Sequence, residues 1–598
     1  MKKLLLFILI LLIPFMINAE ELKLNWQKSW GGNRDETFSK ILKTPDGGFI
    51  VYGYSESTDI EGLPNKGWKD AIILKYDKDG NLLWQNSWGG NSDDVFEGVF
   101  QTEDGGIIGY GYSRSTDIEG LPNKGEDDAI IVKYDKDGNL MWQKSLGGTD
   151  FDSFHSVSLT EDGRFITAGG CSTDIDGITS IGGCDGIIVK YDKDGNMIWQ
   201  RNWGGNDYDE FRNILQTQDD GFIVYGFSYS TDIEGLPNKG EDDAIIVKYD
   251  KDGNMLWQKS WGGNSYDDFY DILQTQDGGF IVYGVSLSTD IEGLPNKGRS
   301  DAIIVKYDKD GNVLWQKSWG GNDYDDIYGI FQTLDGGFIA YGYTDSNDIE
   351  GLPIKDWYDS IILKYDKDGN LMWQKSCGGN DFEFLYKLFR TEDGGFIASG
   401  YTVSNGLGGI LDVKEYDSII LKYDKDGNLM WQKSWGGNDF DEFRNIFQTE
   451  DGGFIVSGSS SSTDIEGMPN KGSLEEIIVK YSIEYELEYI TTENGVFTAE
   501  QQGKYGIITS TPNEGYEVET IIIKDKNGEV LDLEVTKLED GTYSFDLYTD
   551  VSVEVTFKEK VENPKTGIID IITILFVGAV VSLGGFVLVK RYNERYEI

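Results

Sequence analysis

A sequence repeat of about 58 residues recurs along most of the chain, and it constrains the fold more than any other feature. Its marker tryptophan recurs at intervals of 58, 58, 57, 58, 58, 58 and 58 residues, at Trp26, Trp84, Trp142, Trp199, Trp257, Trp315, Trp373 and Trp431. A repeat of this length is one supersecondary unit, which buries its apolar face only by packing against neighbouring copies. The fold must therefore be an array of similar units.

Each unit contains four predicted strands joined by glycine-rich turns. In the second unit the strands are the stretch around Phe96 to Gln101 and then residues 106–112, 129–134 and 140–145. The Asp-Gly-Gly and Asp-Lys-Asp-Gly-Asn turns are typical of hairpins, because glycine supplies the positive φ that such turns need. The third strand, AIIVKY, is continuously apolar, which indicates burial on both faces. Four-stranded sheets repeated radially are propeller blades; a linear solenoid, the alternative, usually has shorter coils.

The two ends of the repeat region predict how the array closes. Trp26 begins a fourth-strand sequence, WQKSWGG, without three strands before it, and residues 477–481 form a third strand without WQKSW after it. Residues 22–30 should therefore complete the last blade, which removes the open sheet edge. The sequence predicts an all-β fold, an eight-bladed propeller over residues 20–481, followed by a small β module (482–560) and a C-terminal transmembrane helix.

The charge balance narrows the range of partners. The chain has 53 Lys and Arg against 104 Asp and Glu, a formal net charge of −51. We expect no nucleic-acid partner, because a phosphate backbone is bound by basic patches. One histidine, His155, and three cysteines leave little for zinc chemistry or a disulfide scaffold. We expect a binding protein that is not an enzyme.

The N-terminus has the pattern of a secretory signal peptide over residues 1–19. Lys2 and Lys3 precede an apolar run over residues 4–17, and Ala19 follows as a small residue at the expected cleavage point. The alternative, a membrane anchor, is weaker because this run is shorter than the roughly 20 residues that a spanning helix needs.

The C-terminus combines a pentapeptide, an apolar stretch and a basic tail. The pentapeptide is Asn563, Pro564, Lys565, Thr566 and Gly567, within residues 561–567. The apolar stretch of 22 residues, 568–589, is long enough to cross a bilayer, and cations in the tail 590–598 favour a cytoplasmic end. The alternative is a plain membrane anchor.

These three parts, in this order, resemble the LPxTG-type cell-wall sorting signal of Gram-positive bacteria, with Asn563 in place of leucine. The resemblance implies transient recognition by a sortase, cleavage between Thr566 and Gly567, and covalent transfer of the Thr566 carbonyl to peptidoglycan. The mature protein would then stand on the extracellular side of the cell wall.

Two internal regions also resemble parts of known surface proteins. The units over residues 22–481 are similar to tandem β-propeller repeats of bacterial surface proteins, loosely kelch-like in their paired glycines. This implies a rigid platform for binding or adhesion to an unidentified extracellular protein or glycan. Residues 482–560 resemble the divergent internalin-type B-repeats in Pro512, Gly515-Tyr516 and 551–557, which implies a stalk.

A surface enzyme and a passive coat component are the alternatives. Quinoprotein dehydrogenases and sialidases share parts of the repeat, but the arginines that a propeller enzyme would need do not recur at one blade position: Arg34, Arg114, Arg164 and Arg212. Asp77, Asp79 and Asn81 favour a closed turn over a calcium loop, since the distal glutamate of an EF-hand is missing.

The long STDIEGLPNKG loops and the WGGN segments are expected on one face of the propeller, opposite the tight turns. We take this face as the candidate ligand face, because long loops on rigid scaffolds usually carry function. Acidic pairs recur there, at Asp59 and Glu61, Asp117 and Glu119, Asp232 and Glu234, Asp290 and Glu292, and Asp464 and Glu466. We expect an acidic ring that attracts cationic ligands or Ca²⁺, and we expect no other cofactor. The alternative is that these acids cap turns.

The cysteines are placed unevenly. Cys171 and Cys184 flank the irregular loop of the third unit, where they either form a disulfide outside the cell or remain thiols. Cys377 replaces a repeat tryptophan and is predicted to be a buried thiol. We interpret His155, which lies beside the first strand of the third unit, as a structural residue.

Overall fold

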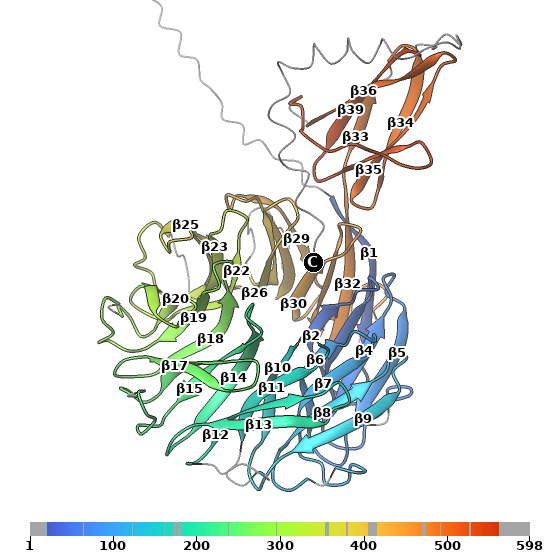
Figure 1. Ribbon diagram of the computed structural model, residues 1–598. Helices are drawn as coiled ribbons and strands as arrows, with labels where there is room; N and C mark the ends of the chain where they lie inside the picture. Colours follow the sequence, from blue (N-terminus) through green and yellow to red (C-terminus); the bar gives the residue numbers. More distant parts are fainter. Residues whose placement is uncertain are drawn as a thin grey trace, which may run out of the picture. The chain divides into compact units, whose positions relative to one another are not determined.

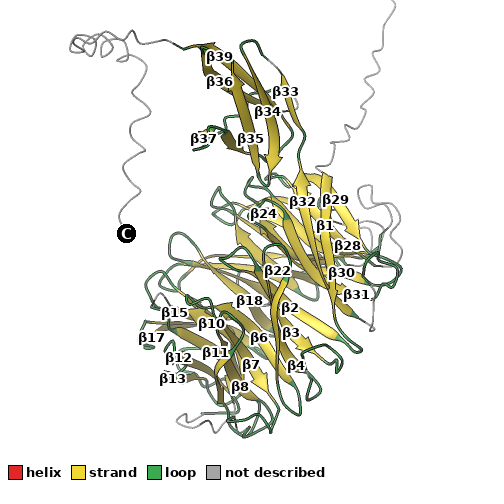
Figure 2. Cartoon of the chain, turned by 90° about the vertical axis from the view of Figure 1, so that its right-hand side faces the viewer, coloured by secondary structure: helices red, strands yellow, loops and turns green. Residues whose placement is uncertain are grey.

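The computed structural model describes residues 21–560 apart from 64, 122, 161, 172–174, 176–180, 237, 295, 353–357, 378–380, 405–415, 469–473, 491 and 526–527. The regular elements of these residues are β-strands (Figure 2). None of the described segments is a helix that could cross a bilayer. The predicted signal peptide, sorting motif, membrane span and basic tail lie outside the described residues.

Two compact units divide the chain, and each is described by itself. The first comprises residues 1–486 with 501–505 and 547–549, and the second comprises residues 487–500, 506–546 and 550–598. The predicted boundary after residue 481 lies close to the main division.

Unit 1 has a propeller-like arrangement of four-stranded antiparallel sheets, which follow one another in chain order (Figure 1). Eight such sheets occur within the described residues. Sheets 1 to 4 are β2(Glu36–Lys43), β3(Phe49–Ser55), β4(Asp70–Tyr76), β5(Leu82–Trp88); β6(Asp94–Gln101), β7(Ile107–Ser113), β8(Asp128–Tyr134), β9(Leu140–Leu146); β10(Ser153–Leu159), β11(Phe165–Cys171), β12(Asp185–Tyr191), β13(Met197–Trp203); and β14(Asp209–Gln216), β15(Phe222–Ser228), β16(Asp243–Tyr249), β17(Met255–Trp261).

Sheets 5 to 8 repeat this order. They are β18(Asp267–Gln274), β19(Phe280–Ser286), β20(Asp301–Tyr307), β21(Val313–Trp319); β22(Asp325–Gln332), β23(Phe338–Thr344), β24(Asp359–Tyr365), β25(Leu371–Cys377); β26(Glu383–Arg390), β27(Phe396–Thr402), β28(Asp417–Tyr423), β29(Leu429–Trp435); and β30(Asp441–Gln448), β31(Phe454–Ser460), β32(Glu475–Glu484), with β1(Glu21–Trp30) as the fourth strand.

The core lies between the sheets, as the apolar third strands require. Every residue of β8 is buried, and the third strands of the other sheets have the same pattern except at the end of β32. Each cluster of buried side chains joins two neighbouring sheets; one contains Phe38 and Ile72 of sheet 1 with Ile455 and Ile478 of sheet 8. Because each buried aliphatic or aromatic side chain contributes roughly 1.5–3 kcal/mol, these clusters hold the sheets together.

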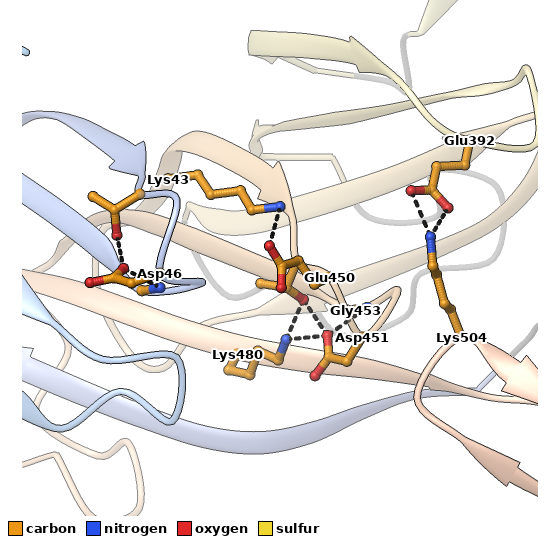
Figure 3. Close-up of polar contacts among 11 residues, drawn as sticks. Lys43, Asp46, Glu392, Glu450, Asp451, Gly453, Lys480 and Lys504 are labelled. Atoms are coloured by element: carbon orange, nitrogen blue, oxygen red, sulfur yellow. Dashed lines mark hydrogen bonds and ion pairs between the residues drawn. The ribbon is translucent and has the colours of Figure 1, made fainter. Parts of the chain in front are cut away.

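The first and last sheets are joined as the sequence predicted. Strand β1 pairs antiparallel with β32, with Trp26 opposite Lys480. Across the junction between sheets 8 and 1, the Trp30 indole donates a hydrogen bond to Gln85 Oε1 at 3.1 Å. Lys43 of sheet 1 also approaches Glu450 of the turn after β30, at 3.6 Å (Figure 3). A linear solenoid is excluded, since its first and last coils would not contact one another.

Two polar contacts recur around unit 1, one between neighbouring sheets and one within each sheet. At the outer strands, a tryptophan indole donates to a glutamine of the next sheet, as in Trp319 to Gln374 at 2.9 Å. At the Asp-Gly-Gly turns, a buried lysine of the third strand donates to the turn aspartate, as in Lys480 to Asp451 at 2.8 Å (Figure 3). Cys377 cannot make the indole bond; it is a buried free thiol, as predicted, 3.0 Å from the Tyr423 hydroxyl.

Unit 2 contains two small sheets, in agreement with the β module predicted here. One consists of β33(Leu487–Ile490), β39(Val551–Glu559) and β36(Tyr516–Asp525), in which β33 and β39 are parallel. The other consists of β34(Gly495–Gln502), β35(Tyr505–Pro512), β38(Tyr543–Asp546) and β37(Thr536–Lys537). Its small core includes Phe497, Ile508 and Phe545, which are buried.

Candidate functional site

The aspartates of the predicted acidic ring accept hydrogen bonds from the neighbouring connection. Asp117 Oδ1 accepts from the backbone N–H of Asn91 in the WGGN segment, at 2.8 Å. The same bond is formed at Asp59, Asp232 and Asp290. At these four positions the long loop therefore contacts the WGGN segment, and the carboxylate accepts the hydrogen bond that joins them. Asp464, the fifth aspartate of this set, also has a polar interaction.

The glutamates of these pairs contribute through their backbone carbonyl groups. In each case a glutamine side chain of the same sheet donates to that carbonyl, at 2.6 to 2.9 Å: Glu61, Glu119, Glu234, Glu292 and Glu466. No cluster of three or more His, Cys, Asp or Glu side chains suited to a metal ion is found in the described part of the chain. The Ca²⁺ expectation stays a prediction.

The Asp-Lys-Asp-Gly-Asn turn is stabilised by hydrogen bonds among its own residues. Asp77 accepts hydrogen bonds from the backbone N–H groups of Asp79 and Asn81, at 2.9 and 2.7 Å, and from the Asn81 side chain at 2.9 Å. Gly80 follows with φ of 79°, a value that side-chain-bearing residues rarely adopt. This geometry is the turn that the sequence favoured over a calcium loop.

Beneath the loop face, each junction between sheets contains a pair of buried acids. Asp243 begins the third strand of sheet 4, and Asp267 begins the first strand of sheet 5; they are 1% and 0% exposed. The oxygens of both carboxylates lie within 3.0 Å of the position that a Cβ would take at Gly262, so only glycine fits there. Asp267 accepts from Ser286, Ser288 and Gly263.

The two acids of such a pair are held differently. Asp267 has three hydrogen-bond donors, whereas Asp243 Oδ1 has no hydrogen-bond partner among the described residues. Burial, with a smaller contribution from the carboxylate of Asp267, raises the pKa of Asp243 to about 6. Burial likewise raises the pKa of Asp70, Asp128 and Asp301 to about 6. Sequence reasoning missed these acids because they occupy the ends of ordinary strands.

A cavity of about 480 Å³ opens where sheets 2, 3 and 4 meet. Its lining includes Glu97, Phe151, His155, Tyr208 and Glu210. Phe151 and Tyr208 are exposed by 55% and 42%, so the pocket presents two aromatic rings to solvent. The volume lies within the range of ligand pockets, roughly 300–1,000 Å³. We call this cavity the sheet 3 pocket.

His155 and Glu210 form the centre of the sheet 3 pocket. His155 Nε2 of β10 lies 2.6 Å from Glu210 Oε1 of β14, and the Tyr208 hydroxyl donates to Glu210 Oε2 at 2.7 Å. Burial opposes a charge on His155, but the hydrogen bond and charge of Glu210 outweigh it and raise the His155 pKa. The same contact, with that of Tyr208, lowers the pKa of Glu210 although burial opposes this. The pair is therefore an ion pair below the His155 pKa.

A second ion pair borders the pocket. The Arg114 guanidinium binds both carboxylate oxygens of Asp127, with Nη2 to Oδ2 at 3.2 Å. It also lies 5.9 Å from the ring centres of Tyr112 and Phe151. A bidentate contact holds the guanidinium in a fixed plane. Arg114 thus supports Phe151 while its charge is compensated by Asp127.

The His155–Glu210 contact occupies a position that recurs around unit 1. The corresponding contacts between neighbouring first strands are Arg212 with Asp268, Tyr270 with Asp326, and Tyr386 with Glu442. The positions of these contacts are the same in each pair of sheets, and only the residue types differ. The pocket therefore arises from substitutions at equivalent positions of the repeat. An alignment of the eight copies would have marked His155 as the departure, but not the residue that it meets.

The cysteine predictions have different outcomes. Cys184 is buried and lines the sheet 3 pocket. The side chain of Cys171 lies outside the described part of the structure, so the predicted disulfide stays a prediction. His155, which we interpreted as a structural residue, lines the sheet 3 pocket.

Comparisons with known proteins are distant. No protein-family model matches the chain. A regulatory protein, FlaEY of Caulobacter vibrioides, is 31% identical over 269 residues, 39% of this chain and 27% of that protein. An uncharacterized WD repeat-containing protein, L264 of Acanthamoeba polyphaga mimivirus, is 19% identical over 469 residues, 62% of this chain and 34% of that protein. The matched regions thus cover about a third or less of either relative.

Among solved structures, YCF48 bound to D1 peptide is 11% identical with a TM-score of 0.28, over 64% of this chain and 96% of that chain. Prolyl oligopeptidase B from Galerina marginata is 11% identical with a TM-score of 0.35, over 71% of this chain and 55% of that chain.

Proposed function

We propose that this chain is a secreted surface protein, anchored to the Gram-positive cell wall, whose eight sheets are the blades of one closed propeller that binds an extracellular ligand. The sheet 3 pocket carries the binding part of this proposal. It combines a cavity of about 480 Å³, exposed aromatic rings and a His155–Glu210 pair at one place in a repeated frame. Binding sites commonly combine apolar rings with a few convergent polar groups.

The ends of the chain support the location. The signal pattern over residues 1–19 would export the protein, and Thr566 would be joined to peptidoglycan by a sortase. Unit 2 would act as the spacer between propeller and wall. The aromatic rings and carboxylates that line the sheet 3 pocket favour ligand binding, so binding or adhesion is the function we propose.

The binding part is tested by a screen of glycans and extracellular matrix proteins with the purified protein and two variants. Phe151→Ala removes an exposed pocket ring, whereas Tyr324→Ala removes the corresponding ring of sheet 6, which is 37% exposed and outside the pocket. Ligands retained by the wild type and Tyr324→Ala but lost by Phe151→Ala would support the proposal. Equal retention by all three would contradict it.

The location is tested separately by fractionation of the producing cells. Thr566→Ala should remove the protein from wall fragments released by muramidase and leave it in the membrane or medium. Recovery of the variant from wall fragments at the wild-type level would contradict sortase anchoring.

A further inference from the structure

The charge of the sheet 3 pocket is strongly one-sided. Five carboxylates line it, from Glu97, Asp127, Asp150, Asp152 and Glu210, and neither lysine nor arginine is among the described lining residues. Asp127 is compensated by Arg114, and Glu210 by His155 when that ring is protonated. Glu97 is exposed and forms no ion pair within the described part of the chain. The described lining residues therefore carry more carboxylates than bases, and Glu97 is the acid on which the argument rests.

Aromatic faces accompany this charge. Phe151 and Tyr208 expose about half of their surface, and Tyr112 lines the same cavity. Burial and the Glu210 carboxylate raise the pKa of Tyr208 far above its ordinary value, so its ring stays neutral. Aromatic faces attract cations through their quadrupole, most strongly where carboxylates lower the local potential. Arg114, which borders the pocket without lining it, lies 5.9 Å from the centre of the Phe151 ring, so this ring already has a guanidinium near it.

The Ser153 hydroxyl offers a further contact. Ser153 is a lining residue of the pocket, and its Oγ is a buried atom with no hydrogen-bond partner among the described residues. A hydroxyl accepts as well as donates, so it can accept an N–H from a ligand. Acid, ring and acceptor are therefore present together on neighbouring sheets.

Building on the proposed binding function, we propose that the sheet 3 pocket binds an organic cation, an alkylammonium or guanidinium group. A carboxylate such as Glu97 would compensate the charge, and Phe151 and Tyr208 would pack against the cation and its alkyl stem. The group would come from a lysine or arginine side chain of a protein or from a small free amine.

The test is a titration of the purified protein with N-acetyl-arginine amide and its neutral isostere N-acetyl-citrulline amide, followed by calorimetry and ligand-observed NMR. We expect the arginine derivative to bind at least about tenfold more tightly, because only it carries the charge. We expect its affinity to fall with added salt, because the pocket is open to solvent. Equal affinity for the two ligands would overturn the proposal.

Matched variants locate the site. Glu97→Gln and Phe151→Leu should each weaken binding of the arginine derivative several-fold. Glu61→Gln and Tyr324→Leu, which remove a carboxylate and an aromatic ring outside the pocket, should not. Binding that is unaffected by the two pocket variants would overturn the proposal. Comparison of an arginine-containing tripeptide with agmatine then distinguishes a protein partner from a free amine.

The experiments distinguish a failure of the organic-cation proposal from a failure of the proposed binding function. If a screened ligand is lost with Phe151→Ala yet N-acetyl-arginine amide does not bind or compete, the cation proposal is wrong and the binding function stands. If the arginine derivative binds as expected but no screened macromolecule does, the cation proposal stands and adhesion is contradicted.

Discussion

The junction between sheets 3 and 4 and the junction between sheets 4 and 5 are built on the same plan but have different chemistry. At the first, His155 contacts Glu210, to which Tyr208 donates. At the second, Arg212 contacts Asp268, to which Tyr266 donates at 3.0 Å. The corresponding bases thus differ in one property, since arginine stays charged at any pH of interest and histidine titrates near neutrality.

The acids of the two junctions also differ in burial. The Asp268 side chain is 1% exposed and the Glu210 side chain 14% exposed. A permanent charge suits the closed junction, because the buried Asp268 always needs compensation. The titratable, more open pair lies beside the cavity. The comparison shows how a repeat acquires one distinctive site: the backbone frame is kept and a few side chains are changed.

The largest expected difference between the junctions comes from removing the base. Arg212→Ala should lower the free energy of unfolding by about 3–5 kcal/mol, because it leaves the buried Asp268 uncompensated. His155→Ala should cost less, since Glu210 is more exposed and keeps its bond from Tyr208. Urea unfolding at pH 7 measures both. Equal losses would contradict the distinction between a closed and an open junction.

A second difference between the two junctions concerns their pairs of buried acids. Asp243→Asn should raise the free energy of unfolding by about 1–3 kcal/mol at pH 8, because the buried carboxylate has an oxygen without a hydrogen-bond partner and the amide is neutral. The Asp243 pKa is raised from 3.8 to about 6. The native state therefore keeps a proton that the unfolded state has lost, and wild-type stability declines as pH rises through this window.

The gain from Asp243→Asn should accordingly shrink from pH 8 to pH 4. Asp185→Asn, at the junction of sheets 3 and 4, should give a smaller gain at pH 8, because the Asn202 side chain already donates to Asp185 at 2.9 Å. Thermal unfolding across this pH range compares the two variants, and a pH-independent gain at Asp243 would contradict the argument.

Replacing His155 of the His155–Glu210 pair should give a pH-dependent loss of stability of intermediate size. His155→Gln should destabilise the protein by about 1–2 kcal/mol at pH 6, because a charge-assisted hydrogen bond is replaced by a neutral one. The His155 pKa is raised above 6.5, so its contribution is complete below that value and disappears as pH rises through the raised pKa. The difference from wild type should vanish by pH 9. Arg212→Gln, the control, should show no such change over this range.

The smallest expected effect should be the same at both junctions. Trp203 donates to Gln258 at 2.7 Å across sheets 3 and 4, and Trp261 donates to Gln316 at 3.0 Å across sheets 4 and 5. Each Trp→Phe variant should lose about 1 kcal/mol for the missing hydrogen bond. Unequal losses in chemical unfolding would show that the irregularity of the sheet 3 pocket extends to the outer rim.

The strand pattern could be predicted because each strand is local. The second repeat predicted strands at 106–112 and 140–145, and the structure has Ile107–Ser113 and Leu140–Leu146. The pairing of β1 with β32 also followed from counting strands. The acidic ring of the loops stays a prediction, whereas the structure shows the loop aspartates accepting hydrogen bonds from Asn91 and its equivalents.

The sequence by itself determined the repeated unit, its four strands, the continuously buried third strand and the splice of the first strand into the last sheet, because periodic burial and turn chemistry are written in neighbouring residues. The tertiary structure alone decided which side chains of different sheets meet. His155 and Glu210 are neighbours only because successive sheets place one repeat beside the next. Contacts of this kind depend on lateral packing over a whole repeat length, so the sheet 3 pocket could not be found from the order of residues.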